Sequence, residues 1–245
     1  MPKYCVIVPA AGKAERFGGA EKKTFAKIDG RAVFLRSLEH FINRPDVCQT
    51  ILAVSPEDVA TVKTTYGPNL GFMGIKLVEG GARRCDTIAA ALKIVSNDAE
   101  YVAIHDAARP CVTMEMIDAV FAEAVKSAAA ILAAPLVGTV KLVSRAWVIE
   151  KTVDRSGLYE AQTPQVFRKD LILAAYAKLA ADPALDPTDD AELVERSGHA
   201  VSVVLADASN LKITTKGDLT LAAAIIKSRP ARTVPRMGAF EEAKW

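Results

Sequence analysis

Hydrophobic and polar positions along the chain follow two periods in turn, as expected when strands and helices alternate. Short apolar runs predict buried strands over residues 6–8, 50–54, 75–78, 101–104, 129–136 and 201–205. Apolar residues at helical spacing predict helices over 32–41, 56–65, 84–95, 116–128, 189–197 and 218–227. This alternation favours an α/β fold with a mainly parallel, twisted sheet and helices on both faces.

The pattern changes between residues 137 and 161, where two strand-like pieces, 140–143 and 147–153, are separated by turn residues. We interpret this stretch as a β-arm that extends from the sheet, of a kind that often contacts a second subunit. A helix is predicted again over 164–181, interrupted near Arg168. Gly67-Pro68-Asn69 is expected to end the helix that begins at Pro56. We expect one domain over 1–228 and a loosely held tail over 229–245.

Composition narrows the class of protein. A chain of 245 residues with 51% hydrophobic residues is long enough for a large core, and its formal net charge of +2 gives no support to nucleic-acid binding. No signal peptide and no apolar run of about 20 residues is present, so we expect no membrane segment. The four cysteines, at 5, 48, 85 and 111, lack a C-x-x-C spacing. They are expected to be free thiols of a cytoplasmic protein.

The loop after the first strand is the first candidate for chemistry. The strand stops at Pro9, and the small residues Ala10, Ala11 and Gly12 let the main chain approach a ligand closely. Four cations follow in the same stretch: Lys13, Arg16, Lys22 and Lys23. Backbone N–H groups and cations together favour a phosphate. The alternative is an ordinary strand-to-helix turn, and neither a P-loop nor a G-x-G-x-x-G motif is present.

Further polar clusters follow other predicted strands: Gly80-Gly81 with Arg84 and Thr87, then Asp106 to Arg109, then Asn210-Leu211-Lys212. The carboxyl ends of parallel strands meet at one edge of a sheet, so these loops are expected to share a crevice. Gly81 and Thr87 suit contacts to a base and ribose. The alternative is that Gly81 only permits the turn and that Thr87 lies on a helix surface. Lys212 and Arg155 are, taken singly, ordinary surface cations.

Asp106 is the best metal candidate, because Mg²⁺ is usually held by one or two carboxylates together with waters and phosphate oxygens. Its alternative role is to cap the following turn or to pair with Arg109. His105 is interpreted as structural. The pair Asp189 and Asp190 is interpreted as a helix start, with Asp189 as N-cap and Glu192 at the third position, rather than as an acid–base pair.

Seven motifs, in the same order along the chain, resemble those of the 2-C-methyl-D-erythritol 4-phosphate cytidylyltransferases. They are Pro9-Ala10-Ala11-Gly12 with Arg16 and Lys23, Gly80-Gly81-x-x-Arg84-x-x-Thr87, His105-Asp106-Ala107-Ala108-Arg109-Pro110, Thr152-Val153-Asp154-Arg155, Gln162-Thr163-Pro164-Gln165-Val166-Phe167, Thr188-Asp189-Asp190-Ala191 and Asn210-Leu211-Lys212-Ile213-Thr214.

The resemblance implies a nucleotide-diphospho-sugar transferase-like fold and Mg²⁺-dependent transfer of a cytidylyl group from CTP to 2-C-methyl-D-erythritol 4-phosphate, in non-mevalonate isoprenoid synthesis. It implies that Arg16, Lys23 and Lys212 act on the CTP phosphates and that Asp106 holds Mg²⁺. The residues at the family's nucleotide-contact positions are Ala10, Ala11, Gly12, Gly81, Arg84, Thr87 and Asp106. Acceptor contacts are Arg109, Thr139, Arg155 and Lys212, with Arg109 and Arg155 reaching across a homodimer formed through the β-arm.

Three positions depart from the family pattern. Ala14 replaces a usual second glycine, Lys22 stands where proline commonly precedes the lysine, and Thr87 replaces a serine. A methyl at 14 narrows the approach to the β- and γ-phosphates, and Lys22 competes with Lys23 as the phosphate contact. Thr87 keeps the hydroxyl.

Three rival functions stay open: a cytidylyltransferase for another polyol phosphate such as ribitol 5-phosphate, a non-catalytic nucleotide-binding module, and a dinucleotide oxidoreductase. The form Pro9-Ala10-Ala11-Gly12 together with Ala107-Ala108 favours methylerythritol phosphate as acceptor. Four residues argue against a module without activity: Arg16, Lys23, Asp106 and Lys212.

Overall fold

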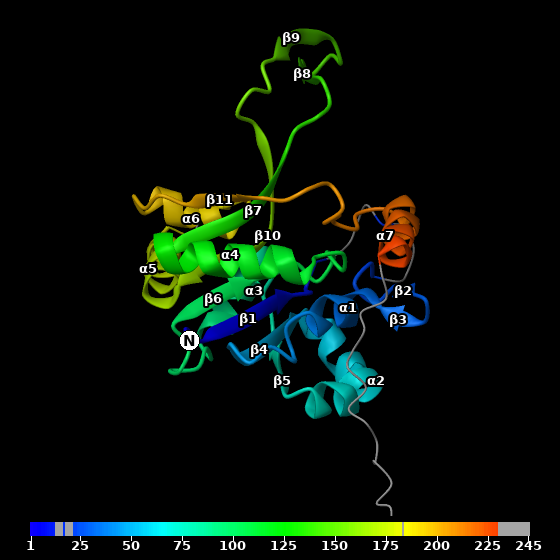
Figure 1. Cartoon of the computed structure of the whole chain (residues 1–245), viewed down its shortest axis with the longest axis vertical. Coiled ribbons are helices and arrows are strands. Elements are labelled where there is room, and N and C mark those ends of the chain that lie inside the picture. Colours follow the sequence, from blue (N-terminus) through cyan, green and yellow to red (C-terminus); the bar gives the residue numbers. More distant parts are fainter. Residues whose placement is uncertain (13–16, 18–21, 183, 230–245) are drawn as a thin grey trace, which may run out of the picture.

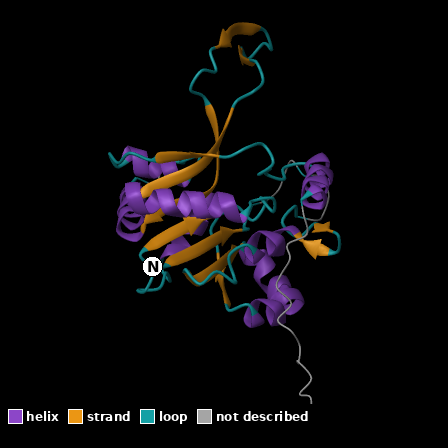
Figure 2. Ribbon diagram, viewed as in Figure 1, coloured by secondary structure: helices purple, strands orange, loops and turns teal. Residues whose placement is uncertain are grey.

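The computed structural model describes residues 1–12, 17, 22–182 and 184–229. Seven strands form one sheet in the order β11-β7-β10-β6-β1-β4-β5 (Figures 1 and 2). They are β1 (Tyr4–Pro9), β4 (Val47–Val54), β5 (Ile75–Glu79), β6 (Tyr101–Ile104), β7 (Ala129–Pro135), β10 (Tyr159–Arg168) and β11 (Ser202–Leu205). Every neighbouring pair is parallel except those of β10, which runs antiparallel to β6 and β7. The predicted mainly parallel, mixed sheet is confirmed.

Helices lie on both faces of the sheet, as predicted. They are α1 (Val33–Glu39), α2 (Val59–Phe72), α3 (Arg84–Leu92), α4 (Met114–Ser127), α5 (Lys169–Ala181), α6 (Asp190–Arg196) and α7 (Lys216–Ser228), and a 3₁₀ turn, η1 (Pro56–Asp58), precedes α2. Side chains alternate between the faces of a strand. Val6 and Val8 therefore pack in a core with α1, α2 and α4, whereas Cys5 and Ile7 pack in a second core with α3, α5 and α6. Burial on both faces explains why β1 is apolar throughout.

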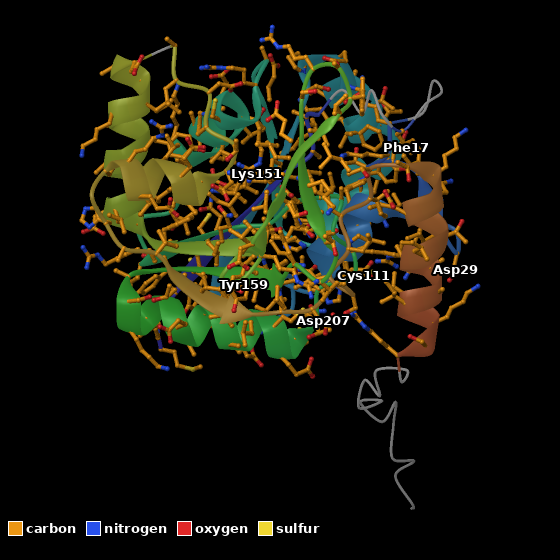
Figure 3. All side chains as sticks on the ribbon, turned by 90° about the horizontal axis from the view of Figure 1, so that it is seen from above. Phe17, Asp29, Cys111, Lys151, Tyr159 and Asp207 are labelled. Atoms are coloured by element: carbon orange, nitrogen blue, oxygen red, sulfur yellow. The ribbon has the colours of Figure 1, made fainter. Side chains whose placement is uncertain are left out.

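A third apolar cluster lies beside the sheet, under α7. It contains Phe17, Ile28, Cys111, Ile213 and Ala222. Figure 3 shows Cys111 next to α7, where its Sγ lies 3.7 Å from the carbonyl oxygen of Ala222. Because Ile213 is buried in this cluster, the packing of α7 anchors the turn that precedes it.

A two-stranded hairpin, β2 (Lys27–Ile28) and β3 (Arg31–Ala32), contributes to the same cluster and was not predicted. Its turn is Asp29-Gly30, with φ of 49° and 77°. Both central residues of a type I′ turn need positive φ, and the Asp-Gly pair is a common way to supply it. The sequence signal was therefore present.

The predicted β-arm is confirmed. Its strands β8 (Val140–Val143) and β9 (Ile149–Val153) pair with each other and not with the main sheet, and the arm projects from the body of the molecule (Figure 1). Its tip is apolar and exposed: Trp147 is 90% exposed and Val148 is 62% exposed.

Two predictions of secondary structure were wrong. Residues 164–168 belong to strand β10 and not to a helix, which begins at Lys169. Pro164 follows a cis peptide bond and lies where the pairing of β10 with β7 shifts register, a position in a sheet that tolerates proline. Gly67-Pro68-Asn69 does not end its helix either, since α2 continues to Phe72. Leu70 is buried against the core, and such packing outweighs weak local propensity.

The four cysteines are free, and only Cys48 is exposed. In the part of the chain that the structure describes, no helix is long and apolar enough to span a bilayer.

Candidate active site

A crevice opens at the carboxyl ends of the parallel strands, where the polar loops of the sequence meet. It is lined by residues that follow β1, β5, β6 and β11: Pro9, Ala10, Ala11, Gly12, Lys23, Thr24, Gly81, Ala82, Arg83, Arg84, Thr87, Asp106, Ala107, Ala108 and Lys212. Nine of the proposed site residues are therefore brought together. Thr139 and Arg155 are not among the lining residues, and Arg16 lies outside the described residues, as does the departure at Ala14.

The glycines at 80 and 81 are required by the close packing of their loop on α3. A Cβ at Gly80 would lie 2.8 Å from Thr87 Oγ1, and one at Gly81 would lie 2.5 Å from Asp86 Cβ. The Gly81 N–H donates to Thr87 Oγ1 at 3.2 Å, and this hydroxyl donates to the Arg83 carbonyl at 3.1 Å. Thr87 is buried, so it holds the glycine loop in place at the wall of the crevice rather than lying on a helix surface.

Asp106 is the acidic centre of the crevice and three cations face it. Lys212 Nζ lies 2.6 Å from Oδ2, Arg109 Nε lies 3.7 Å from Oδ2, and Arg84 Nε lies 3.6 Å from Oδ1. Burial alone raises the pKa of this carboxyl, but the three cations hold it well below its usual range. The carboxylate is therefore ionised at neutral pH, and the crevice keeps an excess of positive charge around it.

The backbone around Asp106 is fixed by Thr163 of β10 and by His105. The Asp106 N–H donates to Thr163 Oγ1 at 3.0 Å. His105 Nδ1 lies 3.2 Å from the same hydroxyl, and Nε2 lies 3.1 Å from the Arg109 carbonyl oxygen. Complete burial lowers the pKa of His105 to about 3. A neutral, hydrogen-bonded imidazole buried inside the loop agrees with the structural role predicted for it.

Arg109 lies behind Asp106 and joins two other segments to this loop. Its Nη1 donates to the Asn210 carbonyl at 2.7 Å, and its Nη2 donates to the Ala161 carbonyl at 3.4 Å. Asn210 in turn donates from Nδ2 to Gln162 Oε1 at 2.9 Å and to the Thr163 carbonyl at 3.0 Å. With only 5% of its side chain exposed, Arg109 faces the interior of its own chain.

The two acidic residues at the start of α6 have different roles. Asp189 is the N-cap, as predicted, and accepts the N–H of Glu192 at 2.9 Å. Asp190 is instead fully buried and accepts from Arg84 Nη2 at 2.7 Å and from the Tyr176 hydroxyl at 2.6 Å. Sequence reasoning missed this contact to a crevice residue. The only signal was a second carboxylate beside the cap, within one of the seven motifs.

Thr24 is a further crevice residue that sequence reasoning did not single out. Its hydroxyl is buried and has no hydrogen-bond partner in the part of the chain that the structure describes. Its position directly after Lys23 was the available signal.

Comparison with known proteins connects this arrangement to one family. The sequence profile of the 2-C-methyl-D-erythritol 4-phosphate cytidylyltransferases matches residues 4–228. The chain belongs to this family. A member from Rhodopirellula baltica is 43% identical over 232 residues, which cover 90% of this chain and 93% of the relative. One from Solibacter usitatus is 36% identical over 241 residues, covering 94% and 98%.

Solved structures of the family share the fold. The 2-C-methyl-D-erythritol 4-phosphate cytidylyltransferase of Thermus thermophilus superimposes with a TM-score of 0.77 at 29% identity, covering 92% of this chain and 99% of that one. The 4-diphosphocytidyl-2C-methyl-D-erythritol synthase of Anaerococcus prevotii gives 0.76 at 28% identity, covering 92% and 99%. The family resemblance inferred from seven motifs is thus confirmed over most of the chain.

Proposed function

We propose that the crevice transfers the cytidylyl group of CTP to 2-C-methyl-D-erythritol 4-phosphate, the reaction by which its family is named, and releases pyrophosphate. One observation carries the proposal: Lys23, Arg84 and Lys212, from two loops and the start of α3, far apart in sequence, line one crevice together with Asp106. Cations from several strand ends suit a polyphosphate, which carries several negative charges along its length.

The chemistry needs positioning and charge more than a base. An oxygen of the acceptor phosphate forms a bond to the α-phosphorus of CTP, the bond from that phosphorus to the bridging oxygen breaks, and pyrophosphate leaves with the electron pair. The acceptor phosphate is already anionic at neutral pH, because its second pKa is about 6. The barrier comes from bringing anions together, and it falls when cations are fixed around the reacting group.

We assign these roles to residues of the chain. Lys23 and Arg16 neutralise the triphosphate, and Lys212 lies at the α-phosphate, where donor and acceptor meet. The backbone at 10–12 and the loop at Gly81 approach the nucleotide, held by Thr87. The two loops lie close together, since a Cβ placed on Gly80 would lie only 3.2 Å from Ala11 Cβ. Small residues in both loops therefore keep side chains out of the space that the nucleotide needs.

The donor set of the crevice fits Mg²⁺. Asp106 offers a single ionised carboxylate, and no group of three His, Cys, Asp or Glu side chains gathers among the described residues. Such a site suits a cation that completes its octahedron with substrate phosphates and water. Asp106 would hold the ion, which, when bound, supplies charge neutralisation at the phosphate oxygens.

The acceptor end of the site requires the arm. Thr139 and Arg155, assigned to the acceptor phosphate, lie at the base of the β-arm rather than in the crevice lining. We propose that a homodimer places the arm of one protomer over the crevice of its partner. The exposed apolar tip of the arm supports an association of this kind.

Release of pyrophosphate from CTP tests the proposal. The assay contains Mg²⁺ and either 2-C-methyl-D-erythritol 4-phosphate or ribitol 5-phosphate, with ATP, GTP and UTP as control nucleotides. We expect release only with CTP and the methylerythritol phosphate. Pyrophosphate release with ribitol 5-phosphate alone would show that the acceptor is another polyol phosphate. No release with any pair of substrates would favour a nucleotide-binding module without catalytic activity.

A further inference from the structure

A buried cluster of three side chains adjoins the crevice: Arg84 from α3, Tyr176 from α5 and Asp190 from α6. Each oxygen of the Asp190 carboxylate faces one donor, Oδ1 the Tyr176 hydroxyl at 2.6 Å and Oδ2 the Nη2 of Arg84 at 2.7 Å. The Asp190 side chain has no exposed surface. A buried carboxylate is tolerated when its charge is compensated and its lone pairs are satisfied. This one meets both conditions through Arg84 and Tyr176.

Arg84 connects the cluster to the crevice. Its side chain is 29% exposed and forms part of the crevice wall. The guanidinium lies between two carboxylates, with Nη2 at 2.7 Å from Asp190 and Nε at 3.6 Å from Asp106. Attraction between charges weakens with distance, so Asp190 is the stronger anchor.

Asp190 itself is held from the sheet. Gln165 Oε1 accepts the N–H groups of Asp190 at 3.1 Å and Ala191 at 3.0 Å, and Gln165 Nε2 donates to Asp189 Oδ2 at 2.8 Å. The start of α6 is thus tied to the buried part of β10. Because these hydrogen bonds fix the backbone of Asp190, its carboxylate is suited to fix the orientation of the flexible arginine that contacts it.

We propose that Asp190 is a positioning residue of the nucleotide site, acting through Arg84 and supported by Tyr176. The carboxylate holds the guanidinium facing the bound nucleotide and away from Oδ1 of Asp106, whereas Lys212 contacts Oδ2. Without its charge, Arg84 pairs closely with Asp106, and both groups are withdrawn from the ligand. This inference rests on the proposed role of Arg84 in binding CTP, and the experiment below separates the two.

The test measures the dissociation constant of CTP by calorimetry for the wild type, Asp190→Asn, Arg84→Ala and the double variant. Loss of a charged hydrogen bond predicts binding roughly tenfold to a hundredfold weaker for Asp190→Asn. We expect KM for CTP to rise far more than kcat falls. In the Arg84→Ala background, Asp190→Asn should cause no further loss, because its target is gone. Additive losses would overturn the proposal.

Two further variants separate positioning from folding. Glu192→Ala removes a carboxylate of the same helix whose hydrogen bonds go to Thr188 and Arg196 rather than to Gln165 or Arg84, and we expect a lower melting temperature with CTP affinity unchanged. Tyr176→Phe keeps the ring and removes the hydroxyl, and we expect CTP binding roughly two- to tenfold weaker. This variant serves in the same cycle if Asp190→Asn does not fold. If Tyr176→Phe weakened CTP binding equally in the wild-type and the Arg84→Ala backgrounds, the proposal would be overturned.

The remaining outcomes separate the two hypotheses. Wild-type affinity in Arg84→Ala would remove Arg84 from the nucleotide site and the inference with it. Weak binding in Arg84→Ala combined with wild-type binding in Asp190→Asn would overturn only the role of Asp190.

Discussion

Lys22 and Lys23 are neighbours with the same charge, and of the two only Lys23 is among the residues that line the crevice. Lys22 Nζ donates to Ser55 Oγ at 2.8 Å, Glu57 Oε1 at 2.8 Å and Asp58 Oδ2 at 2.6 Å. Burial alone lowers the pKa of Lys22, but the hydrogen bonds to Asp58 and Glu57 raise it above its ordinary value. Since Lys22 is not among the crevice-lining residues and its ammonium group is held by these acids, it is the weaker candidate for the phosphate contact.

The two lysines predict different mutant phenotypes. We expect Lys23→Ala and Arg16→Ala to lower kcat/KM for CTP by roughly a hundredfold or more, since each removes a cation that we assign to the triphosphate. Lys22→Ala removes equal charge one residue away and should lower it by less than about tenfold. Steady-state kinetics and thermal melts would compare the three. Equal losses from Lys22→Ala and Lys23→Ala, or near-normal activity in Lys23→Ala and Arg16→Ala, would contradict the assignment.

Asp106 makes a second prediction at this scale. Asp106→Asn keeps the shape and removes the only carboxylate among the described crevice-lining residues, so we expect Mg²⁺-dependent turnover to fall by roughly a thousandfold or more. Circular dichroism should report an intact fold. As a control, Asp170→Asn removes an exposed carboxylate that pairs with Arg168 and does not line the crevice, and turnover should persist. Retained activity in Asp106→Asn would place the metal elsewhere.

At the scale of elements, strand β10 assembles the crevice. Gln162 contacts Asn210, Thr163 contacts Asp106, and Gln165 contacts the start of α6. Three loops from different parts of the chain are thus joined to one strand. The sequence predicted the motif but not its strand, because Pro164 and the following apolar residues also fit a helix. Its partners lie 25 to 57 residues away, which local patterns do not report.

The elements that were predicted correctly share a physical cause. Strands such as β1 are buried on both faces and read as continuous apolar runs, whereas helices such as α4 bury one face, with Ile117, Val120 and Phe121 inward. The failures occurred where tertiary packing decided the outcome, as for Leu70 in α2. Placing the polar loops at strand ends was enough to predict the shared crevice.

The start of α7 supports a third prediction. Asp218 accepts the Thr214 N–H at 2.9 Å and the Thr215 N–H at 2.8 Å, in a capping box that fixes the turn after Lys212. The Thr214 hydroxyl also donates to Asp218, at 2.7 Å. This hydrogen bond, followed by those from the backbone N–H groups, lowers the pKa of Asp218 to about 2. We expect Asp218→Ala to lower the free energy of unfolding by about 1 kcal/mol at neutral pH.

The sign of the pH dependence follows from the depressed pKa. The native state holds Asp218 ionised where the unfolded state binds a proton, so its contribution is present above about pH 4 and is lost as the pH falls toward 2. Urea unfolding of the wild type and Asp218→Ala should differ at pH 7 and converge near pH 2. A difference that stays constant over this range would contradict the capping role of the carboxylate.

At the scale of the whole molecule, the arm and the crevice pose a question of assembly. The arm carries exposed apolar side chains at its tip, Trp147, Val148 and Ile149. Exposure of apolar side chains to water is unfavourable, and a cluster of them typically marks an interaction surface. The arm projects from the body (Figure 1), while the crevice lies at the strand ends. Sequence patterns predicted the arm because its short strands break the helical rhythm. They carried no information on its partner, since contacts between chains leave no local period.

A complementation experiment tests whether Arg155 acts on the crevice of a partner. In the homodimer that we propose, the Arg155→Ala and Lys23→Ala variants should each be nearly inactive. After unfolding and refolding together in equal amounts, half of the dimers are expected to be mixed, and each mixed dimer has one site in which both Arg155 and Lys23 are intact. Activity should therefore recover to about a quarter of the wild-type value. No recovery would show that Arg155 serves its own chain. Adding Trp147→Asp to both variants should abolish the recovery, because a charge at the apolar tip opposes the association on which the shared site depends.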